Sequence, residues 1–265
     1  MRSQRQQQLL SQYGAWAIVT GASSGIGRAM ALQLAEAGLH LVLVARSQAV
    51  LEAMAEDYRD RHGIQVRVLA LDLSQAATVA TVVAQTQDLA VGLLIAAAGF
   101  GTSGAWLKSQ IPQELDMLQV NCRSLLELTW HFSQRFAQQR RGGIVLLSSI
   151  VAFQGVPYSA HYAATKAYVH SFAEALAVEL APLGVDVLAA APGPTATGFA
   201  DRARLTMGQT LDVVTVAQSI LKALGRRSTV LPGWLSKLLA YALWPLPRWA
   251  KVQVMGRVMQ GMTQN

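Results

Sequence analysis

Short apolar runs alternate with segments of helical periodicity along the first 190 residues of the chain. Six runs have the length and composition of buried strands, and helical patterns lie between them. The expected strands are Ala15–Thr20, His40–Ala45, Gln65–Leu71, Val91–Ala96, Gly143–Leu147 and Val185–Ala190. The expected helices are Arg28–Ala37, Gln48–Arg61, Gln75–Gln87, Ile111–Gln139 and Tyr158–Leu183. This alternation predicts an α/β fold with a doubly wound parallel sheet, a Rossmann fold, whose ligands bind at the carboxyl ends of the strands.

The chain divides into three segments. We expect an N-terminal extension over residues 1–13, one Rossmann-fold domain over 14–232, and a basic, amphipathic helical tail over 233–265. A length of 265 residues suits a single α/β domain with a large core. The extension is rich in glutamine and lacks the apolar run of a signal peptide, so we expect no export.

A glycine-rich turn, Thr20 to Gly27, follows the first expected strand and leads directly into a helix. Its glycines, spaced GxxxGxG, let backbone N–H groups approach a pyrophosphate, and the helix N-terminus adds positive potential. Strand, glycine turn and helix in this order are typical of a dinucleotide site. The residues expected to bind the dinucleotide here are Gly21, Ser23, Ser24, Gly25, Ile26 and Gly27.

The second expected strand ends in Ala45 and Arg46. In NAD-binding folds this strand end usually carries a carboxylate that binds the ribose 2′-hydroxyl group. No carboxylate stands here to repel a 2′-phosphate, and the guanidinium of Arg46 can pair with one in bidentate fashion. The sequence therefore predicts NADP(H) as the cofactor.

The ends of the third and fourth strands carry further candidate cofactor contacts. Asp72 is expected to meet the adenine amino group, with Leu73 beside it. Ala98 and Gly99 are small enough to let a cofactor lie against the backbone. A glycine-containing loop over residues 100–104 follows at the expected edge of the active site.

Tyr162 and Lys166 are four residues apart in an expected helix, which places both side chains on one face. A free tyrosine is a poor acid–base catalyst at neutral pH, because its ordinary pKa is about 10. A nearby ammonium group favours the phenolate and lowers that pKa. The pair is therefore a candidate proton donor and acceptor.

An ordered set of motifs resembles the short-chain dehydrogenase/reductase family of the single-domain type over roughly residues 14–232. The spacing supports the resemblance, because a serine lies 13 residues and an asparagine 41 residues before the tyrosine, as in that family. The segment Gly99-Phe100-Gly101-Thr102 and the basic, tryptophan-bearing tail are similar to a bacterial subgroup labelled DltE-like. The matching motifs are Thr20–Gly27, Asp72, Ala98-Gly99, Asn121, Ser149, Tyr162 with Lys166, and Pro192-Gly193.

The resemblance implies a catalytic group of Asn121, Ser149, Tyr162 and Lys166. Tyr162 would exchange a proton with the substrate oxygen, and Ser149 would donate a hydrogen bond to that oxygen. Lys166 would lower the pKa of Tyr162 and hold the nicotinamide ribose, while Asn121 would hold a water that connects Lys166 to solvent. Thr195 and Thr197 would bind the nicotinamide carboxamide. The residues implied to contact this end of the cofactor are Asn121, Tyr162, Lys166, Pro192, Gly193, Thr195 and Thr197.

One departure from the family pattern follows the fourth strand. The family usually has Asn-Asn-Ala-Gly there, whereas this chain has Ala96-Ala97-Ala98-Gly99. The missing amide normally ties the sheet to the cofactor region. We therefore expect some loss of local rigidity but no loss of activity, because no proton-transfer group changes.

The expected substrate pocket is apolar. Its walls come from residues 100–106, residues 151–159 and the segment after Thr197, which are rich in aromatic and small side chains. These walls predict a lipophilic ketone or aldehyde, or the corresponding alcohol, as substrate. The expected substrate contacts are Phe100, Ser149, Phe153 and Tyr162.

Composition and charge argue against several other classes. The net charge of +7 arises entirely from residues 213–265, which carry seven basic and no acidic residues, so a general nucleic-acid surface is not expected. The five histidines lack metal-ligand spacing, and we expect no metal site. The single cysteine, Cys122, excludes an internal disulfide and suits a reducing, cytoplasmic location.

The tail over residues 233–265 combines tryptophans with basic residues, and two prolines, Pro245 and Pro247, divide it. Its apolar runs are too short to span a membrane. Tryptophan at the edge of a basic amphipathic helix favours the membrane interface. One hypothesis is therefore peripheral docking on the inner face of an anionic membrane, with the tail also capping the substrate cleft. The alternative is a substrate lid or a dimer contact.

Three function classes remain for this chain. The first is an NADP(H)-dependent oxidoreductase that interconverts a lipophilic carbonyl compound and its alcohol. The second is a non-catalytic NADP-binding scaffold at a membrane, which would not need the proton-transfer set around Tyr162. The third is a sugar-nucleotide epimerase of the extended type, which would need a larger substrate domain. The resemblance also implies a homodimer or homotetramer.

Overall fold

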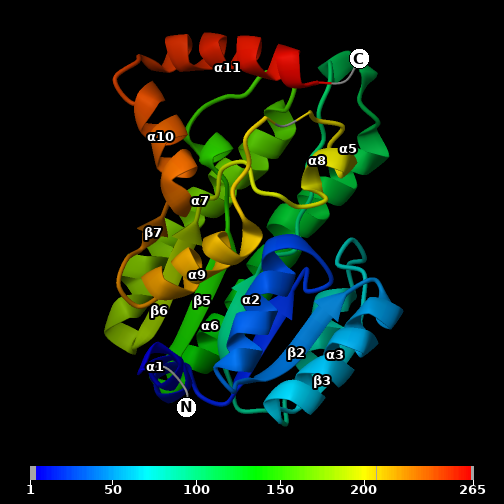
Figure 1. The fold of residues 1–265 in the computed structure, drawn as a ribbon, viewed down its shortest axis with the longest axis vertical. Helices are drawn as coiled ribbons and strands as arrows, with labels where there is room; N and C mark the ends of the chain where they lie inside the picture. The colour runs from blue at the N-terminus through cyan, green and yellow to red at the C-terminus, as the bar shows by residue number, and fades with distance from the viewer. Residues whose placement is uncertain (1–3, 207, 264–265) are drawn as a thin grey trace.

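The computed structural model describes residues 4–206 and 208–263, and within them the strands form a seven-stranded parallel sheet (Figure 1). The strand order is β3-β2-β1-β4-β5-β6-β7, so the direction of winding reverses between β1 and β4. The predicted doubly wound parallel sheet is therefore confirmed. The strands are β1 (Trp16–Thr20), β2 (His40–Ala45), β3 (Val66–Ala70), β4 (Val91–Ala96), β5 (Gly142–Leu147), β6 (Val185–Ala190) and β7 (Thr229–Val230).

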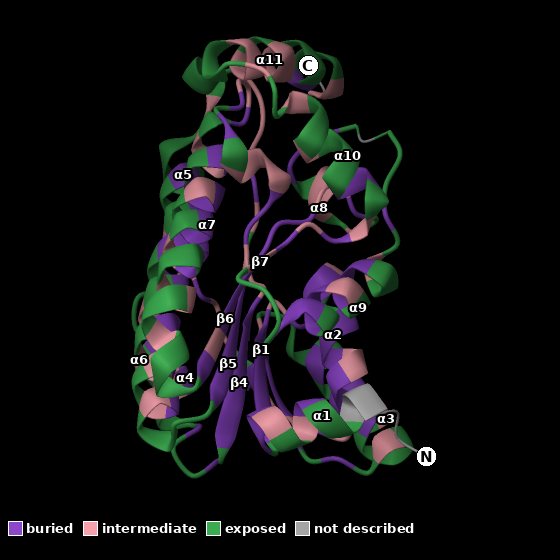
Figure 2. Cartoon of the chain, turned by 90° about the vertical axis from the view of Figure 1, so that its left-hand side faces the viewer, coloured by how far each residue is buried: buried purple, intermediate pink, exposed green. Residues whose placement is uncertain are grey.

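Two hydrophobic cores cover the two faces of the sheet, as Figure 2 shows edge-on. Alternate residues of a strand point to opposite faces, so Ala17 and Val19 of β1 enter one core while Trp16 and Ile18 enter the other. The first core is covered by α2 (Gly25–Glu36), α3 (Gln48–His62) and α9 (Val213–Ala223). The second is covered by α4 (Thr78–Ala84), α6 (Leu125–Gln139) and α7 (Ala160–Leu180).

The helix expected over residues 111–139 is interrupted. It consists of α5 (Ile111–Leu118), a π-helical turn over Gln119–Ser124, and then α6. The apolar spacing continues through the turn, which is why the sequence pattern suggested one helix. Turns of this kind are frequent at functional sites, and this one carries Asn121.

Two other helix boundaries differ from expectation. The helix expected from residue 75 begins at Thr78, because the Ser74 amide donates to the Asp72 carboxylate at 3.0 Å in a local turn. The helix expected from Tyr158 begins at Ala160, because Tyr158 itself adopts a left-handed conformation with φ 62°. The latter helix ends in a 3₁₀ turn over Ala181–Leu183.

A helix that the apolar pattern did not suggest, α1 (Gln4–Tyr13), closes the amino end of the sheet. Tyr13 is fully buried, and its hydroxyl donates to the Asp186 carboxylate at 2.8 Å. A Cβ at Gly92 in β4 would lie 1.7 Å from the Tyr13 carbonyl oxygen, so only glycine permits this approach. These contacts make the end of α1 part of the first core.

Two helices at the C-terminus form what we call the C-terminal arm: α10 (Gly233–Leu243) and α11 (Arg248–Met262). The arm stands beyond the carboxyl ends of the strands, at the top of Figure 1. Ser236 is fully buried and accepts a hydrogen bond from the Gly193 amide at 2.8 Å. At the other end, Leu205 pairs with Thr263 in an antiparallel bridge. In the described part of the chain, no helix is both long and apolar enough to cross a membrane.

Candidate active site

A cavity of about 1030 Å³ lies at the carboxyl ends of the strands, between the glycine-rich turn and the C-terminal arm. The turn depends on its glycines. Gly21 and Gly25 have φ angles of 65° and 54°, and a Cβ at Gly27 would lie 2.4 Å from the Gly21 carbonyl oxygen. Helix α2 starts at Gly25, so its N-terminus faces the cavity and offers unpaired N–H groups to an anion.

The structure brings nearly all the expected cofactor residues to this one cavity. They come from the ends of β1, β2, β3, β4 and β6 and from α7, which lie far apart in the sequence. The lining includes Gly21, Ser23, Ser24, Gly25, Ile26, Gly27, Arg46, Asp72, Leu73, Ala98, Gly99, Tyr162, Lys166, Pro192, Gly193, Thr195 and Thr197. Ser47 and Ser74, which were not among the expected cofactor contacts, also lie there.

The Thr20 side chain connects the end of β1 to the end of β4, a connection of the kind that the missing amide at residues 96–97 would provide. The Ala98 amide donates to Thr20 Oγ1 at 3.1 Å, and the buried Thr20 hydroxyl donates to the Ile95 carbonyl at 3.4 Å. A Cβ at Gly21 would lie 2.9 Å from the Ala98 backbone, so the two strand ends are packed closely. The loss of rigidity expected from Ala96 and Ala97 did not take this hydroxyl into account.

Replacing Thr20 with valine is expected to lower the free energy of unfolding by about 1–3 kcal/mol, because the Ala98 amide loses its acceptor while it stays partly buried. Urea unfolding measures the change. Thr81→Val is the matched control, since the Thr81 hydroxyl bonds only within its own helix at the surface, and its expected effect is within about 0.5 kcal/mol. Equal effects of the two substitutions would contradict the role of Thr20.

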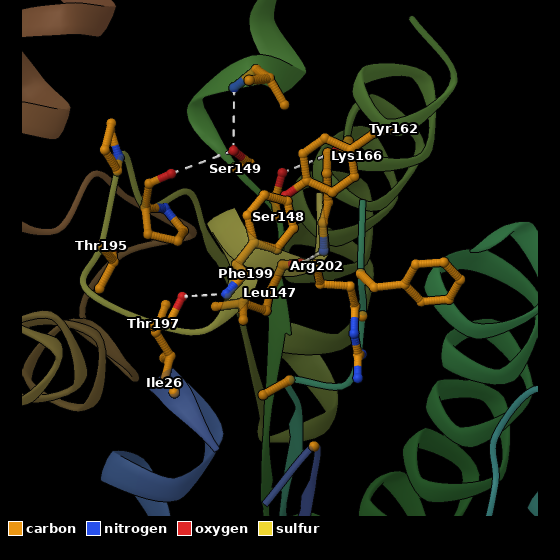
Figure 3. Close-up of a pocket in the computed structure, with 18 of the residues that line it drawn as sticks. Ile26, Leu147, Ser148, Ser149, Tyr162, Lys166, Thr195, Thr197, Phe199 and Arg202 are labelled. Carbon is orange, nitrogen blue, oxygen red and sulfur yellow. Dashed lines mark hydrogen bonds between the residues drawn. The ribbon is translucent and has the colours of Figure 1, made fainter. Parts of the chain in front are cut away.

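Tyr162, Ser149 and Lys166 lie together in the cavity wall (Figure 3). The Ser149 hydroxyl bonds to the Pro192 carbonyl and the Val151 amide, both at 3.4 Å. The Tyr162 ring packs against Phe199 with centroids 5.2 Å apart. Lys166 Nζ donates to the Leu147 carbonyl at 2.7 Å and lies 5.8 Å from the centre of the Tyr162 ring.

The acid–base properties of this group differ from the sequence expectation. Burial raises the pKa of Tyr162, and the hydrogen bond with Ser149 acts in the opposite direction. Lys166 was expected to lower the pKa of Tyr162, but in the structure its ammonium group points to the Leu147 carbonyl. Burial lowers the pKa of Lys166 to about 8, with a smaller opposing effect of Cys122.

We expect the Lys166 amine to lose its proton near pH 8 in the cofactor-free protein, compared with 10.5 in an unfolded chain. Between these values the unfolded state binds more protons, so the contribution of Lys166 to stability rises with pH from about 8 to 10.5. The ¹³Cε chemical shift of Lys166, assigned by its disappearance in Lys166→Met, measures the midpoint. A midpoint above pH 10 would contradict this desolvation.

Asn121 lies just behind the cavity rather than in its lining. Its side chain accepts from the Phe100 amide at 3.1 Å and donates to the Phe100 carbonyl at 2.9 Å and to Thr165 Oγ1 at 3.0 Å. A Cβ at Gly99 would lie 3.0 Å from Asn121 Oδ1 and 3.3 Å from Lys166 Nζ, which explains glycine at that position. Asn121 therefore holds the loop that bears Phe100, and its expected water contact stays a prediction.

The substrate end of the cavity differs in part from expectation. Phe100, Ser149 and Tyr162 line it, but Phe153 is absent from the lining and its half-exposed ring packs edge-on against His170 at 4.7 Å. We therefore assign Phe153 no substrate contact. Apolar side chains of the C-terminal arm line the cavity, although they were not among the expected substrate contacts. These are Leu239, Leu243, Val254, Met255, Val258, Met259 and Met262.

A hydrogen-bonded pair, Glu114 and His161, supports the start of the helix that carries Tyr162. The Glu114 carboxylate, which is almost fully buried, lies 2.7 Å from His161 Nδ1, and Trp106 packs edge-on against the same imidazole. The pair joins α5 to the first turn of α7, directly before Tyr162. Sequence spacing did not suggest it, because the two residues are 47 positions apart.

The family model for the short-chain dehydrogenases matches residues 15–208. Among curated proteins, the chain is 34% identical over 186 residues to a 7β-hydroxysteroid dehydrogenase of Clostridium sardiniense, covering 70% of this chain and 71% of the relative. It is also 36% identical over 182 residues to a very-long-chain 3-oxoacyl-CoA reductase of Podospora anserina, covering 66% of this chain and 53% of that protein.

Solved structures of related proteins match over a larger share of the chain. A 7β-hydroxysteroid dehydrogenase structure matches with a TM-score of 0.86 at 26% identity, covering 93% of this chain and 98% of that one. A short-chain dehydrogenase from Sphingobium yanoikuyae in complex with NADPH matches with a TM-score of 0.79 at 30% identity, covering 87% and 93%. The chain therefore belongs to the short-chain dehydrogenase family and is a carbonyl/alcohol oxidoreductase.

Proposed function

We propose that the chain interconverts a lipophilic ketone or aldehyde and the corresponding alcohol with NADP(H) as the hydride carrier. One observation carries the proposal: Tyr162 and Ser149 share a cavity whose one end is a glycine-rich anion site and whose other end is apolar. The first end suits a dinucleotide phosphate, and the second suits a substrate with little polar surface.

Each member of the catalytic group has a defined task in this proposal. Ser149 donates a hydrogen bond to the substrate oxygen, and Tyr162 gives that oxygen a proton in reduction or takes one in oxidation. Lys166 lies next to the ring in the same wall, where it would hold the nicotinamide ribose. When bound, the nicotinamide supplies or accepts the hydride.

Arg46 supports the preference for NADP(H). It lines the cavity beside Ser47 at the end of β2, and the described part of the chain offers no ion pair that occupies its guanidinium. A free guanidinium at this place suits a 2′-phosphate. The related Sphingobium enzyme was solved with NADPH, which agrees with this assignment.

The apolar end supports a lipophilic substrate. Aliphatic and thioether side chains of the C-terminal arm line it together with Phe100 and Phe199. By name, the related proteins act on hydroxysteroids and very-long-chain 3-oxoacyl-CoA, and another structural neighbour is an alcohol dehydrogenase specific for bulky-bulky ketones. These names support a large apolar substrate for this chain as well.

We further propose a cytoplasmic homodimer or homotetramer. The outer faces of α5, α6 and α7 expose a group of large apolar residues that a second copy would cover. The same side holds a second, smaller cavity of about 360 Å³ beside Cys122 and Tyr168. The exposed residues are Ile111, Leu115, Leu118, Leu126, Trp130, Tyr168 and Val178.

Titration of the purified protein with NADPH and NADH, followed by nicotinamide fluorescence, tests the proposal. We expect tight binding of NADPH and weak binding of NADH, and then NADPH oxidation with ketones that improves with substrate length. Binding of NADPH without turnover of any carbonyl compound would favour the non-catalytic scaffold. Failure to bind either nucleotide would contradict the proposal as a whole.

A further inference from the structure

The tip of the C-terminal arm exposes an unusual amount of aromatic surface. Trp244 is 77% and Trp249 is 72% exposed, and these two residues flank the proline-containing turn between α10 and α11. Along α10, Trp234, Leu238 and Tyr241 are also exposed, and their spacing of i, i+4 and i+7 forms one stripe. Contiguous apolar surface of this kind marks a contact with a partner or a membrane.

Positive charge accompanies this aromatic surface. Arg248 stands between the two tip tryptophans in sequence, Lys237 and Arg257 are exposed on the same two helices, and residues 213–265 contain no acid. None of the ion pairs in the described part of the chain involves these three cations. Their charges are therefore available to an anionic partner.

The inner side of the same helices forms a wall of the cavity. Leu239 and Leu243 of α10 and Met255 and Met259 of α11 line it, so the arm separates the apolar end of the cavity from the outside. Each helix thus has an inner apolar side toward the cavity and an outer surface that is aromatic and basic. Figure 2 shows that exposed and half-buried residues predominate on both helices.

We propose that the arm docks, through its tip, on the surface of an anionic lipid bilayer, and that the lipophilic substrate enters the cavity from that bilayer. Tryptophan is enriched at the headgroup level, where its ring is partly buried and its N–H stays hydrated. Basic residues close to an anionic surface contribute about 1 kcal/mol each. Neither helix has the length to span the bilayer, so the contact is interfacial.

The charge favours lipid over the other occupants of such a surface. A second copy of the chain would bring a like-charged arm against this one, and the excess of +7 in residues 213–265 would oppose that contact. An anionic bilayer reverses the sign of this interaction. It is also the place where a substrate with little polar surface would accumulate.

Vesicle sedimentation of the full chain tests the docking. We expect at least about 10-fold more binding to vesicles containing 30% phosphatidylglycerol (roughly one anionic lipid in three) than to pure phosphatidylcholine, and loss of most of it at high salt. The double variant Trp244→Ala/Trp249→Ala should lose about 10-fold in binding. Val50→Ala is the control, because Val50 is 36% exposed on α3, away from the arm, and should leave binding unchanged.

Other outcomes would overturn the proposal. Equal binding to both kinds of vesicle, or none to either, would contradict docking on an anionic bilayer. Dissociation of an oligomer by the double variant in gel filtration, without vesicle binding by the wild type, would make the tip a contact between copies. NADPH binding by the double variant checks its fold.

Entry of the substrate from the bilayer depends on the proposed function as well as on the docking. With a substrate dissolved in the bilayer, the double variant should lose about 10-fold in turnover, and with a water-soluble ketone it should lose none. If the double variant changed turnover by the same factor with both substrates, entry from the bilayer would be contradicted. Vesicle binding without turnover of any carbonyl compound would contradict the proposed oxidoreductase and leave the docking intact, so the two failures are distinguishable.

Discussion

Replacement of Tyr162 with phenylalanine should lower kcat about 10³-fold while the Kd for NADPH changes less than about twofold. The substitution removes only the hydroxyl, which is the group placed to exchange a proton with the substrate. The ring remains to pack against Phe199 at 5.2 Å, so the shape of the cavity is kept. Steady-state kinetics with NADPH and the best available ketone, together with fluorescence titration, measure the two quantities.

Tyr168→Phe is the matched control for this prediction. Tyr168 lies on the same helix, 40% exposed, and contributes to the smaller cavity rather than to the main one. Its kcat should equal that of the wild type. Substantial activity of Tyr162→Phe would mean that another group transfers the proton, and an equal loss in both variants would indicate a structural effect on α7.

Replacement of Arg46 with aspartate should weaken NADPH binding by roughly 10- to 100-fold, because a charged hydrogen-bond partner is lost and a repulsive carboxylate takes its place. NADH lacks the 2′-phosphate, and the new carboxylate can accept from its 2′-hydroxyl group, so NADH binding should improve. The preference should therefore move toward NADH. The ratio of the two Kd values, measured by fluorescence titration, is the quantity to compare.

Arg28→Asp separates this role from a general effect of charge. Arg28 is exposed on α2 and absent from the cavity lining, so its replacement changes the net charge equally and should leave the ratio of Kd values unchanged. A shift of preference in Arg28→Asp but not in Arg46→Asp would mean that the 2′-phosphate is bound at α2, with Ser23 as the neighbouring candidate.

The sheet was predictable because most of its longer strands are buried apolar runs, whose side chains alternate between the two cores. The prediction was less accurate where local conformation depends on distant contacts. β7 has two residues and no periodicity to detect. The end of α1 is ordered by Tyr13, whose hydroxyl bonds to Asp186 173 positions away. The π-helical turn at Asn121 keeps the apolar pattern of an uninterrupted helix.

The site was predictable where a residue's role depends on its place at a strand end, as for Arg46 and Gly99. The site was harder to predict where a residue's role depends on what packs against that residue. The spacing of Tyr162 and Lys166 suggested a lowered tyrosine pKa, but burial has the larger effect and raises it. One sequence hypothesis was that the tail over residues 233–265 caps the substrate cleft, yet which of its residues face the cavity depends on packing against segments earlier in the chain.

The thioether side chains of α11 make the cavity wall sensitive to oxidants. Met255, Met259 and Met262 recur at i, i+4 and i+7 and all line the apolar end. Oxidation of such a side chain to the sulfoxide replaces a flexible apolar group with a polar one. Because the three share one helical face, hydrogen peroxide would impair the site for lipophilic ligands while the glycine-rich turn, which presents backbone groups, would still bind the nucleotide.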